Sequence, residues 1–339
     1  MIGKSTKGIQ TAIVLLLFIV LTACGSAANN KANTDEATGQ NATSSLQEEQ
    51  KDNQQASNTE VATRVVTGEF GEVTIPVNPK RVAGIYVEDY LKALGVDPVV
   101  QWYNPTWGTQ EYLKLDAPLF DVTGSLEALM AEEPDLIILD GGGDKEKYDQ
   151  YSKIAPTFRI PEEALQSSEE MLKVVADVLG IPEKAESVLA EYNKNVDAAK
   201  VKFEQSIGKE TVAVIRVNTG DKTIALFGIK NRFVGELYSK FGLEPHQLVK
   251  DMENFQEILS EEAFATLDAD HIIVLVSNGD WNSPENADSI ELLNSSLWKA
   301  VPAFANDHVY KVDRSHWQSG AIYSNFLKLD DLLKYLVQE

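Results

Sequence analysis

Short apolar runs alternate with amphipathic segments from about residue 64 onward, as expected for strands that alternate with helices. A hairpin is predicted over 64–79, where Gly68 and Gly71 separate two apolar runs. The capping pair Ser167 and Glu170 predicts the start of a helix that Gly180 ends. The other elements predicted in this half are strands over 81–85, 99–103 and 136–139, and helices over 88–93 and 125–132. Such alternation implies a mostly parallel sheet.

The segment 181–208 has a different pattern. Its apolar residues recur every three or four positions, Pro182 lies in the first turn, and Gly208 follows the last; the residues are Ala185, Val188, Leu189, Tyr192, Val196, Ala199 and Phe203. The spacing predicts one amphipathic helix of over twenty residues, about 30 Å long at 1.5 Å per residue. Such a helix is long enough to connect two lobes.

The alternation resumes after this helix. Strands are predicted over 212–217, 272–276 and 308–312, and helices over 233–240, 262–267 and 321–336. We therefore predict an α/β fold of two Rossmann-like lobes, 64–180 and 209–339, joined by the long helix 181–208. A cleft between two such lobes is the usual place for a small-molecule site.

The N-terminus has the features of an export signal. Lys4 and Lys7 precede the apolar run 13–21, and small residues lead to Cys24, the only cysteine of the chain. We predict a lipoprotein signal peptide over 1–23, lipid attachment at Cys24, and a location on the extracytoplasmic face of the cell membrane. The polar segment 24–63 is too poor in apolar residues to pack a core, so it is predicted to be a disordered tether.

Charge and motif content exclude several functions. The formal net charge of -22 disfavours nucleic acid as a partner. No nucleophile elbow, dinucleotide fingerprint or phosphate-binding loop is present, so the protein is not expected to be an enzyme. The four histidines, His246, His271, His308 and His316, are scattered, and no direct metal site is predicted.

Seven short segments, taken in order, resemble the periplasmic-binding-protein family whose lobes are joined by a rigid helix, in the branch that binds siderophores, vitamin B12 and heme. They are 78–82, 94–99, 126–129, 134–138, 153–157, 297–303 and 309–313, followed by Trp317. The resemblance covers nearly all of 66–339. It implies a substrate-binding lipoprotein that captures a ferric siderophore and delivers it to the permease of an ABC transporter.

The same resemblance implies how the protein docks. Members of this family present one acidic residue on each lobe to arginines of the permease, and Glu127 and Glu262 match these positions. A carboxylate that accepts two hydrogen bonds from a guanidinium fixes orientation as well as attraction. Both residues also lie early in predicted helices, where acids are favoured by the helix dipole alone.

Arginine and aromatic residues are the candidate ligand contacts. Arg216 interrupts an apolar strand, Arg314 follows a strand end, and Arg232 opens a helix. The resemblance adds Trp317 and supports Arg216, while Tyr86, Trp102 and Tyr323 offer large faces with one polar group each. Because cleft arginines are few, a hydroxamate or mixed hydroxamate and carboxylate siderophore is favoured over a triply charged catecholate.

Two alternatives remain at this point. The same fold binding heme would need an axial Tyr or His, for which Tyr86, Tyr323 and His316 are candidates, and a cobalamin is a further possible cargo. A surface-anchored enzyme would need a converging acid, base and nucleophile in the cleft. We expect no cofactor, since iron would arrive already chelated, and we expect a monomer.

Overall fold

The computed structural model describes residues 62–220, 223–294, 296 and 298–337, all of them within the unit Asn58–Glu339. The predicted signal peptide 1–23, Cys24 and all but the last two residues of the predicted tether 24–63 lie outside the described residues. Within the described ranges, no helix is both long enough and apolar enough to cross a membrane.

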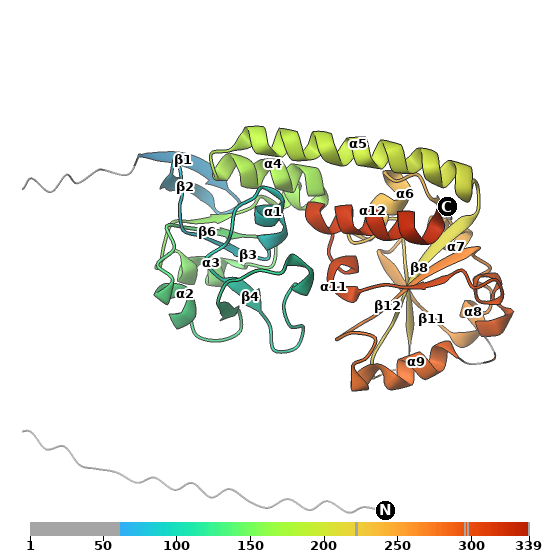
Figure 1. Ribbon diagram of the computed structural model, residues 1–339. Coiled ribbons are helices and arrows are strands. Elements are labelled where there is room, and N and C mark those ends of the chain that lie inside the picture. The colour runs from blue at the N-terminus through green and yellow to red at the C-terminus, as the bar shows by residue number, and fades with distance from the viewer. Residues whose placement is uncertain (1–61, 221–222, 295, 297, 338–339) are drawn as a thin grey trace, which may run out of the picture. The chain divides into compact units, whose positions relative to one another are not determined.

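The N-terminal lobe is built on a parallel sheet in the order β3-β6-β7. The predicted hairpin is present as β1 and β2, and β4 and β5 form a second parallel pair (Figure 1). The elements are β1 (Thr63–Gly68), β2 (Gly71–Pro76), β3 (Val82–Ile85), α1 (Glu88–Ala93), β4 (Gln101–Tyr103), η1 (Glu111–Leu113), β5 (Leu119–Asp121), α2 (Glu127–Ala131), β6 (Leu136–Leu139), α3 (Lys145–Tyr151), β7 (Thr157–Arg159), η2 (Glu162–Gln166) and α4 (Ser168–Val178).

The C-terminal lobe contains a mixed sheet in the order β11-β9-β8-β12-β13, with β10 paired to β8. Strands β8, β12 and β13 are parallel, whereas β9 and β11 run antiparallel to their neighbours. The elements are β8 (Thr211–Val217), β9 (Ile224–Phe227), α6 (Gly235–Ser239), β10 (Glu244–Pro245), α7 (Gln247–Asp251), β11 (Gln256–Leu259), α8 (Glu261–Phe264), β12 (His271–Val276), η3 (Pro284–Asn286), α9 (Ala287–Leu293), η4 (Trp298–Ala300), α10 (Pro302–Ala305), β13 (Val309–Lys311), α11 (Arg314–Trp317) and α12 (Ile322–Leu336).

Successive residues along the central strands pack into different cores. Val212 and Val214 of β8 join the largest core, which also takes residues from α5 and α12, whereas Ala213 and Ile215 join a second core on the other side of the sheet. This division follows from the two-residue period of a strand. In the N-terminal lobe, Leu136 likewise belongs to the largest core and its neighbour Ile137 to a third.

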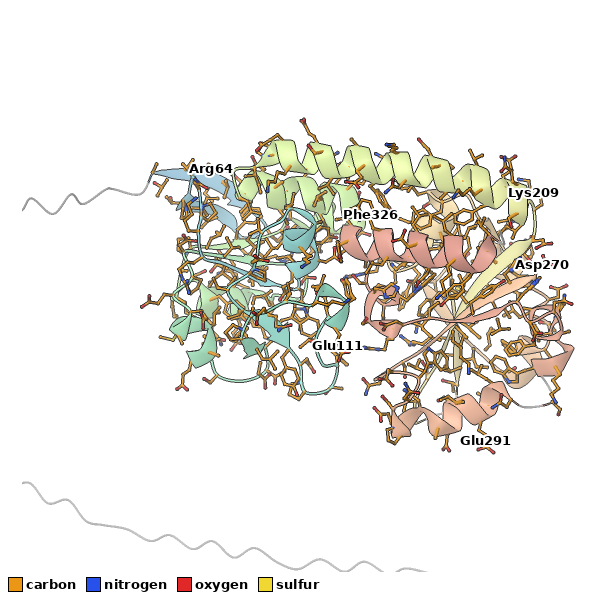
Figure 2. The ribbon with its side chains drawn as sticks, viewed as in Figure 1. Arg64, Glu111, Lys209, Asp270, Glu291 and Phe326 are labelled. Carbon is orange, nitrogen blue, oxygen red and sulfur yellow. The ribbon has the colours of Figure 1, made fainter. Side chains whose placement is uncertain are left out.

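The predicted connecting helix is α5, Pro182–Ser206, with Pro182 at its first turn. It runs along both lobes, packed against α4 on one and α12 on the other (Figure 1). Its apolar stripe is buried, and the ring of Tyr192 packs edge-on against Phe326 of α12 at 5.0 Å between centroids. Phe326 is labelled on α12 in Figure 2. Because the largest core includes residues of both lobes and of α5, the lobes share one continuous apolar interior.

The expectation of a mostly parallel sheet holds for the N-terminal lobe and is wrong for the edge of the C-terminal sheet. Strands β9 and β11 were not predicted, and both run antiparallel to their neighbours. The remaining predicted elements are present with shifts of a few residues at their ends; the helix predicted over 233–240, for example, is α6, Gly235–Ser239. Short terminal turns are the part of a helix that an apolar pattern defines least well.

Asp89 of α1 joins the two lobes by polar contacts. It is buried, and its carboxylate accepts the backbone N–H groups of Tyr323 and Ser324, 2.7 and 2.9 Å away, at the start of α12. The hydroxyl of Tyr112 donates to the same carboxylate at 2.6 Å. The first N–H groups of a helix have no partner within the helix, and here a carboxylate from the N-terminal lobe accepts two of them from a C-terminal helix. The helix dipole also favours negative charge at this end.

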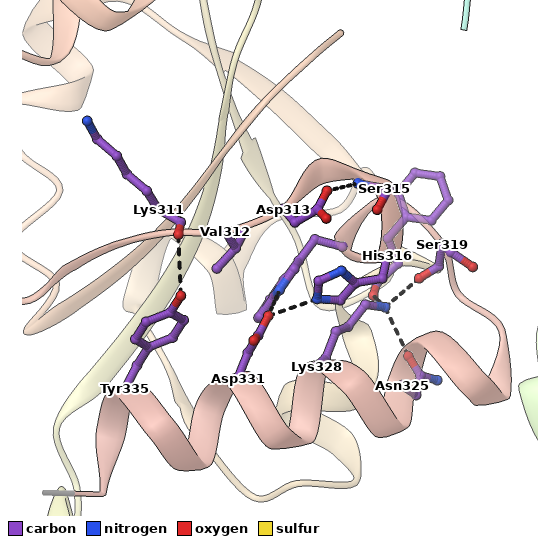
Figure 3. Close-up of polar contacts among 12 residues, drawn as sticks. Lys311, Val312, Asp313, Ser315, His316, Ser319, Asn325, Lys328, Asp331 and Tyr335 are labelled. Carbon is purple, nitrogen blue, oxygen red and sulfur yellow. Dashed lines mark hydrogen bonds and ion pairs between the residues drawn. The ribbon is translucent and has the colours of Figure 1, made fainter. Parts of the chain in front are cut away.

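Glu236 of α6 makes the reciprocal contact from the C-terminal lobe. One carboxylate oxygen accepts the hydroxyl of Ser168 in α4, and the other accepts the hydroxyl of Tyr192 in α5, both at 2.5 Å. Lys328 lies fully buried in α12, and its ammonium donates to the Phe233 carbonyl at 2.6 Å. It also donates to the Ser319 carbonyl and, at 2.9 Å, to the Asn325 side chain (Figure 3).

We call these residues the interlobe junction: Asp89, Tyr112, Ser168, Tyr192, Glu236 and Lys328. Burial raises the pKa of Asp89 to about 6, against the effect of its hydrogen bonds, and lowers the pKa of Lys328 to about 7. The charges of Glu236 and Asp89 act on Lys328 in the opposite direction and favour its ammonium form. Each buried charge therefore depends on the others.

Replacing Asp89 by alanine should lower the free energy of unfolding by about 3 kcal/mol, because two N–H groups and a hydroxyl lose their acceptor and Lys328 loses a counter-charge. Urea unfolding followed by circular dichroism measures this change. Asp149→Ala is the matched control, since Asp149 is exposed in an i,i+4 pair with Lys145 and should change stability by less than about 0.5 kcal/mol. Equal effects of the two substitutions would contradict the role given to Asp89.

Candidate functional site

A cavity of about 760 Å³ lies between residues of the N-terminal and C-terminal lobes. Its lining includes Tyr86 and Asp140, which directly follow β3 and β6, and Arg216 near the end of β8. Ser277, directly after β12, also lines it. The carboxyl ends of parallel strands from both sheets therefore converge on one space, which is where open α/β sheets place their ligands.

The three candidate arginines are brought together in this cavity. The Arg216 side chain is held by its Nε, which donates to the Asn218 side chain at 2.8 Å, and the guanidinium lies over the Phe227 ring, 5.5 Å from the centroid. Arg314 begins α11 after the cap Asp313, and its Nε donates to the Ser277 carbonyl at 2.8 Å. Both guanidinium groups are thus oriented by the ends of neighbouring strands.

Arg232 reaches the cavity from a loop that is fixed on both sides. Asn231 is buried and donates its side-chain amide to the Phe255 carbonyl at 3.2 Å, while its oxygen accepts the N–H of Phe233 at 2.9 Å. Across the loop, a Cβ added to Gly320 would lie 2.3 Å from the Arg232 carbonyl. The close approach of the Arg232 backbone therefore requires glycine at position 320.

The N-terminal lobe contributes an aromatic wall. Tyr86 and Trp102 both line the cavity, with ring centroids 4.7 Å apart. Tyr86 has φ of 64°, a left-handed conformation that is uncommon for a bulky residue and is concentrated at functional sites. Trp107, 54% exposed, lies at the rim on a turn closed by a bridge between Asn104 and Gly108.

Two carboxylates, Asp140 and Glu236, also line the cavity. Asp140 is buried and accepts the N–H of Gly142 at 2.7 Å; burial raises its pKa to about 6, whereas the Gly142 hydrogen bond and the charges of Arg232 and Arg159 act to lower it. Asp140 and Arg232 also line an adjoining space of about 410 Å³, together with Lys147. The main cavity therefore continues into a side chamber at Asp140.

Two of the residues predicted to contact ligand are placed elsewhere. Trp317 is completely buried in the largest core, and its indole N–H donates to Asp331 at 2.8 Å. Tyr323, in the first turn of α12, stacks on Tyr112 with ring centroids 6.4 Å apart. Neither residue is among those that line the cavity, and ligand contact by either stays a prediction. Trp317 instead fixes α11, and with it Arg314, to α12.

The two candidate docking acids lie on different lobes. Glu127 is exposed at the first position of α2, and its N–H donates to the Ser125 hydroxyl at 3.1 Å. Glu262 lies in α8, Glu261–Phe264, and its side chain is outside the part of the chain that the structure describes. The assignment of both residues to docking stays a prediction.

Several lining residues are not among the predicted ligand contacts, for example Asp140, Lys230 and Trp107. Asp140 had a usable signal, because it is the first polar residue after the buried strand β6. Lys230 and Trp107 lie in loops, and no local pattern indicates which way a loop side chain points.

The cavity offers cationic, aromatic and hydrogen-bonding groups. Four lining residues each have a buried polar atom without a hydrogen-bond partner among the described residues: Trp102 Nε1, Gln110 Oε1, Ser315 Oγ and Gln318 Oε1. Such groups are uncommon in native proteins and call for a partner from water or ligand. In the described ranges, no three His, Cys, Asp or Glu side chains are grouped so that they could hold a metal ion.

Glu88 lies beneath the aromatic wall, fully buried at the start of α1. One of its oxygens accepts the backbone N–H of Trp102 at 2.9 Å, and the other has no partner among the described residues. Burial raises the pKa of Glu88 from 4.5 to about 8, an effect that backbone N–H groups oppose and the charge of Asp140 reinforces. This carboxyl group is therefore protonated in the folded protein at neutral pH.

The folded protein keeps a proton on Glu88 that the unfolded chain releases, so stability falls as the pH rises from about 4.5 to 8. Glu88→Gln, an uncharged substitution of the same size, should remove this part of the pH dependence. Between about pH 5 and pH 8 the wild type should lose about 3 kcal/mol more unfolding free energy than the variant, measured by urea unfolding. Glu186→Gln, exposed on α5, is the control, and a Glu88→Gln variant with the wild-type pH slope would contradict the assignment.

Comparison with known proteins gives a consistent result. The "Iron(3+)-hydroxamate-binding protein FhuD" of Bacillus subtilis is 29% identical over 342 residues, covering 96% of this chain and 94% of the relative. A solved FhuD fold-family periplasmic binding protein, a component of a Fep/Fec-like ferrichrome ABC transporter from B. subtilis, is 29% identical, with a TM-score of 0.68 over 81% of this chain and all of that one.

A second solved structure, Staphylococcus aureus SirA complexed with staphyloferrin B, is 24% identical and has a TM-score of 0.66 over 81% of this chain and 98% of that one. At this identity it supports the fold: two α/β lobes and a long connecting helix. The model of the periplasmic binding protein family matches residues 121–315, which is more than half of the chain. The chain therefore belongs to the periplasmic binding protein family.

Proposed function

We propose that this protein captures a ferric siderophore in the cavity between its lobes and delivers it to the permease of an ABC transporter. The observation that carries the proposal is the convergence of three arginines and an aromatic wall on one cavity of about 760 Å³. This volume lies in the range of small-molecule sites. Guanidinium groups suit the oxygen-rich surface of a ferric chelate, and indole and phenol rings suit its bulk.

The ligand contacts that we propose are Arg216, Arg314 and Arg232 on one side and Tyr86 and Trp102 on the other. Iron arrives already chelated, so the protein supplies no metal ligand and needs no cofactor. Hydroxamate or mixed hydroxamate and carboxylate siderophores fit the proposal, and the B. subtilis relative is named for an iron-hydroxamate. The protein acts as a binding protein rather than an enzyme.

Delivery requires a location at the membrane and a contact with the permease. We propose that Cys24 carries the lipid anchor after removal of residues 1–23, and that residues 24–63 let the folded part reach the permease as a monomer. Glu127 and Glu262 then each meet an arginine of the permease. Their positions on separate lobes would let the permease contact both sides of the loaded cavity.

Titration of the purified full chain with ferric siderophores tests the cargo through tryptophan fluorescence. Trp102 and Trp107 line the cavity, so a bound ferric chelate should quench their emission with a saturable response at submicromolar ligand. Trp107→Phe should reduce the quenching amplitude, whereas Trp281→Phe should leave it unchanged, because Trp281 does not line the cavity and donates to the Val312 carbonyl instead. A response to heme or cobalamin alone would mean that one of these, and not a siderophore, is the cargo. No response to any of these ligands would refute the proposal.

Docking is tested by import into cells. Glu127→Ala combined with Glu262→Ala should abolish uptake of radioactive iron from the siderophore. The dissociation constant of the purified protein should stay within about twofold, since Glu127 does not line the cavity and no described side chain of α8 does. Glu186→Ala, an exposed acid on α5, should leave both quantities unchanged. Normal uptake in the double variant would show that these residues are not needed for docking.

A further inference from the structure

Three uncharged polar side chains of the main cavity lie where the two lobes meet. Gln110, directly before η1, belongs to the N-terminal lobe, and Ser315 and Gln318, in and directly after α11, belong to the C-terminal lobe. All three line the cavity. The elements η1 and α11 contact each other, with the rings of Tyr112 and His316 6.2 Å apart between centroids. We call Gln110, Ser315 and Gln318 the uncharged patch.

Each residue of the uncharged patch has a buried oxygen without a hydrogen-bond partner among the described residues: Gln110 Oε1, Ser315 Oγ and Gln318 Oε1. Buried polar atoms are nearly always paired in native proteins, with protein or with water. Water can pair with these oxygens before a ligand binds, but a ligand that displaces the water must then supply the hydrogen bonds itself. A ligand that lacks suitable groups leaves the oxygens unpaired, which lowers its affinity.

The side of α11 that faces the cavity is set by the contacts of α11 with α12. His316 Nε2 lies 2.8 Å from the Asp331 carboxylate (Figure 3), and the indole N–H of Trp317 donates to the same carboxylate at 2.8 Å. Ser315 and Gln318 are three positions apart, so they lie on one side of this turn, and both line the cavity. The contacts with α12 thereby hold both patch residues of α11 in place.

The side-chain amide of Gln110 has a fixed orientation. Its Nε2 lies 3.2 Å from the hydroxyl oxygen of Tyr112. The single proton of that hydroxyl is donated to Asp89 at 2.6 Å, and this carboxylate is ionised at neutral pH because burial raises its pKa only to about 6. The Tyr112 oxygen can therefore only accept a hydrogen bond from Gln110. The amide nitrogen must face Tyr112, which leaves the amide oxygen as an acceptor for the cavity.

We propose that the cavity favours ferric chelates that carry amide N–H or hydroxyl groups beside the iron centre, and that Gln110 Oε1 accepts a hydrogen bond from such a group. Ser315 and Gln318 bind further polar groups of the same chelate from the opposite lobe, so the ligand bridges η1 and α11. Tyr112 is a positioning residue that acts by orienting the Gln110 amide. This inference rests on the proposed function, and it concerns the uncharged groups of the chelate rather than its charge.

The first test compares two uncharged chelates on the full chain at neutral pH. One is ferrioxamine E, a cyclic ferric trihydroxamate whose ring contains secondary amides, and the other is an analogue with esters in place of these amides. The change removes the N–H donors and keeps the iron centre and the ring size. Ferrioxamine E should bind at least about tenfold more tightly in fluorescence quenching titrations, because the ester analogue leaves Gln110 Oε1 unpaired.

The second test removes the acceptor. Gln110→Met keeps an unbranched side chain of similar length and should reduce the preference for ferrioxamine E over the ester analogue to less than about threefold. Tyr112→Phe should also reduce this preference, because the released amide can turn its nitrogen toward the cavity. Gln166→Met is the matched control, since it makes the same change at an exposed position of the lining and should keep the wild-type preference.

Equal binding of the two chelates by the wild type, or tighter binding of the ester analogue, would overturn the inference and leave siderophore capture intact. A wild-type preference in Gln110→Met or in Tyr112→Phe would also overturn it, because the selective acceptor would then lie elsewhere. Circular dichroism confirms the fold of each variant, and the comparison on the wild type needs no variant. Failure of both chelates to bind would refute this inference, and the wider titration with other siderophores decides the proposed function separately.

Discussion

The rest of the site depends on one contact, in which the buried carboxylate of Asp89 in α1 accepts hydrogen bonds from the first turn of α12. It satisfies two N–H groups of the opposite lobe, and Lys328 and Glu236 extend the same polar junction toward α5 and α4. The cavity is lined by residues of both lobes, so its dimensions are set by how the lobes are held together. A junction of buried charges, each of which needs its partner, resists sliding more strongly than an apolar contact does, because any displacement leaves a charge unpaired.

The same junction relates the fold to the chemistry of the site. Glu236 belongs to both the junction and the cavity lining, and its hydrogen bonds to Ser168 and Tyr192 engage both of its oxygens. The cationic side chains of the C-terminal lobe therefore dominate one side of the cavity, while the N-terminal lobe adds uncharged rings and a protonated Glu88 beneath them. In this acidic protein, three arginines of the described lining are thus gathered at one cavity.

Much of this could be predicted from the sequence. The helix α5 was predicted because its apolar period continues over many turns, and Arg216 stood out because an arginine in an apolar strand needs a partner or a site. The alternation of strands and helices on both sides of α5 also predicted the two-lobe arrangement, which the solved FhuD-fold relative confirms. These features depend on local pattern or on many residues at once.

Other features could not be predicted, since they depend on contacts between distant segments. Asp89 and Tyr323 are 234 residues apart, and no local pattern links them. Trp317 was named as a ligand contact from the family resemblance, but it is buried in the largest core and donates to Asp331 of α12, a contact that no local pattern indicates. The antiparallel strand β11 is short, and its exposed Ile258 gives it little apolar pattern.

The most direct test of the central claim is to locate the iron. Crystals of the protein with a bound ferric siderophore, measured at the iron absorption edge, should give one anomalous peak inside the cavity, between the Tyr86 and Trp102 rings on one side and Arg216 and Arg314 on the other. A peak outside the cavity, or saturable binding in solution with no iron between the lobes, would contradict the account.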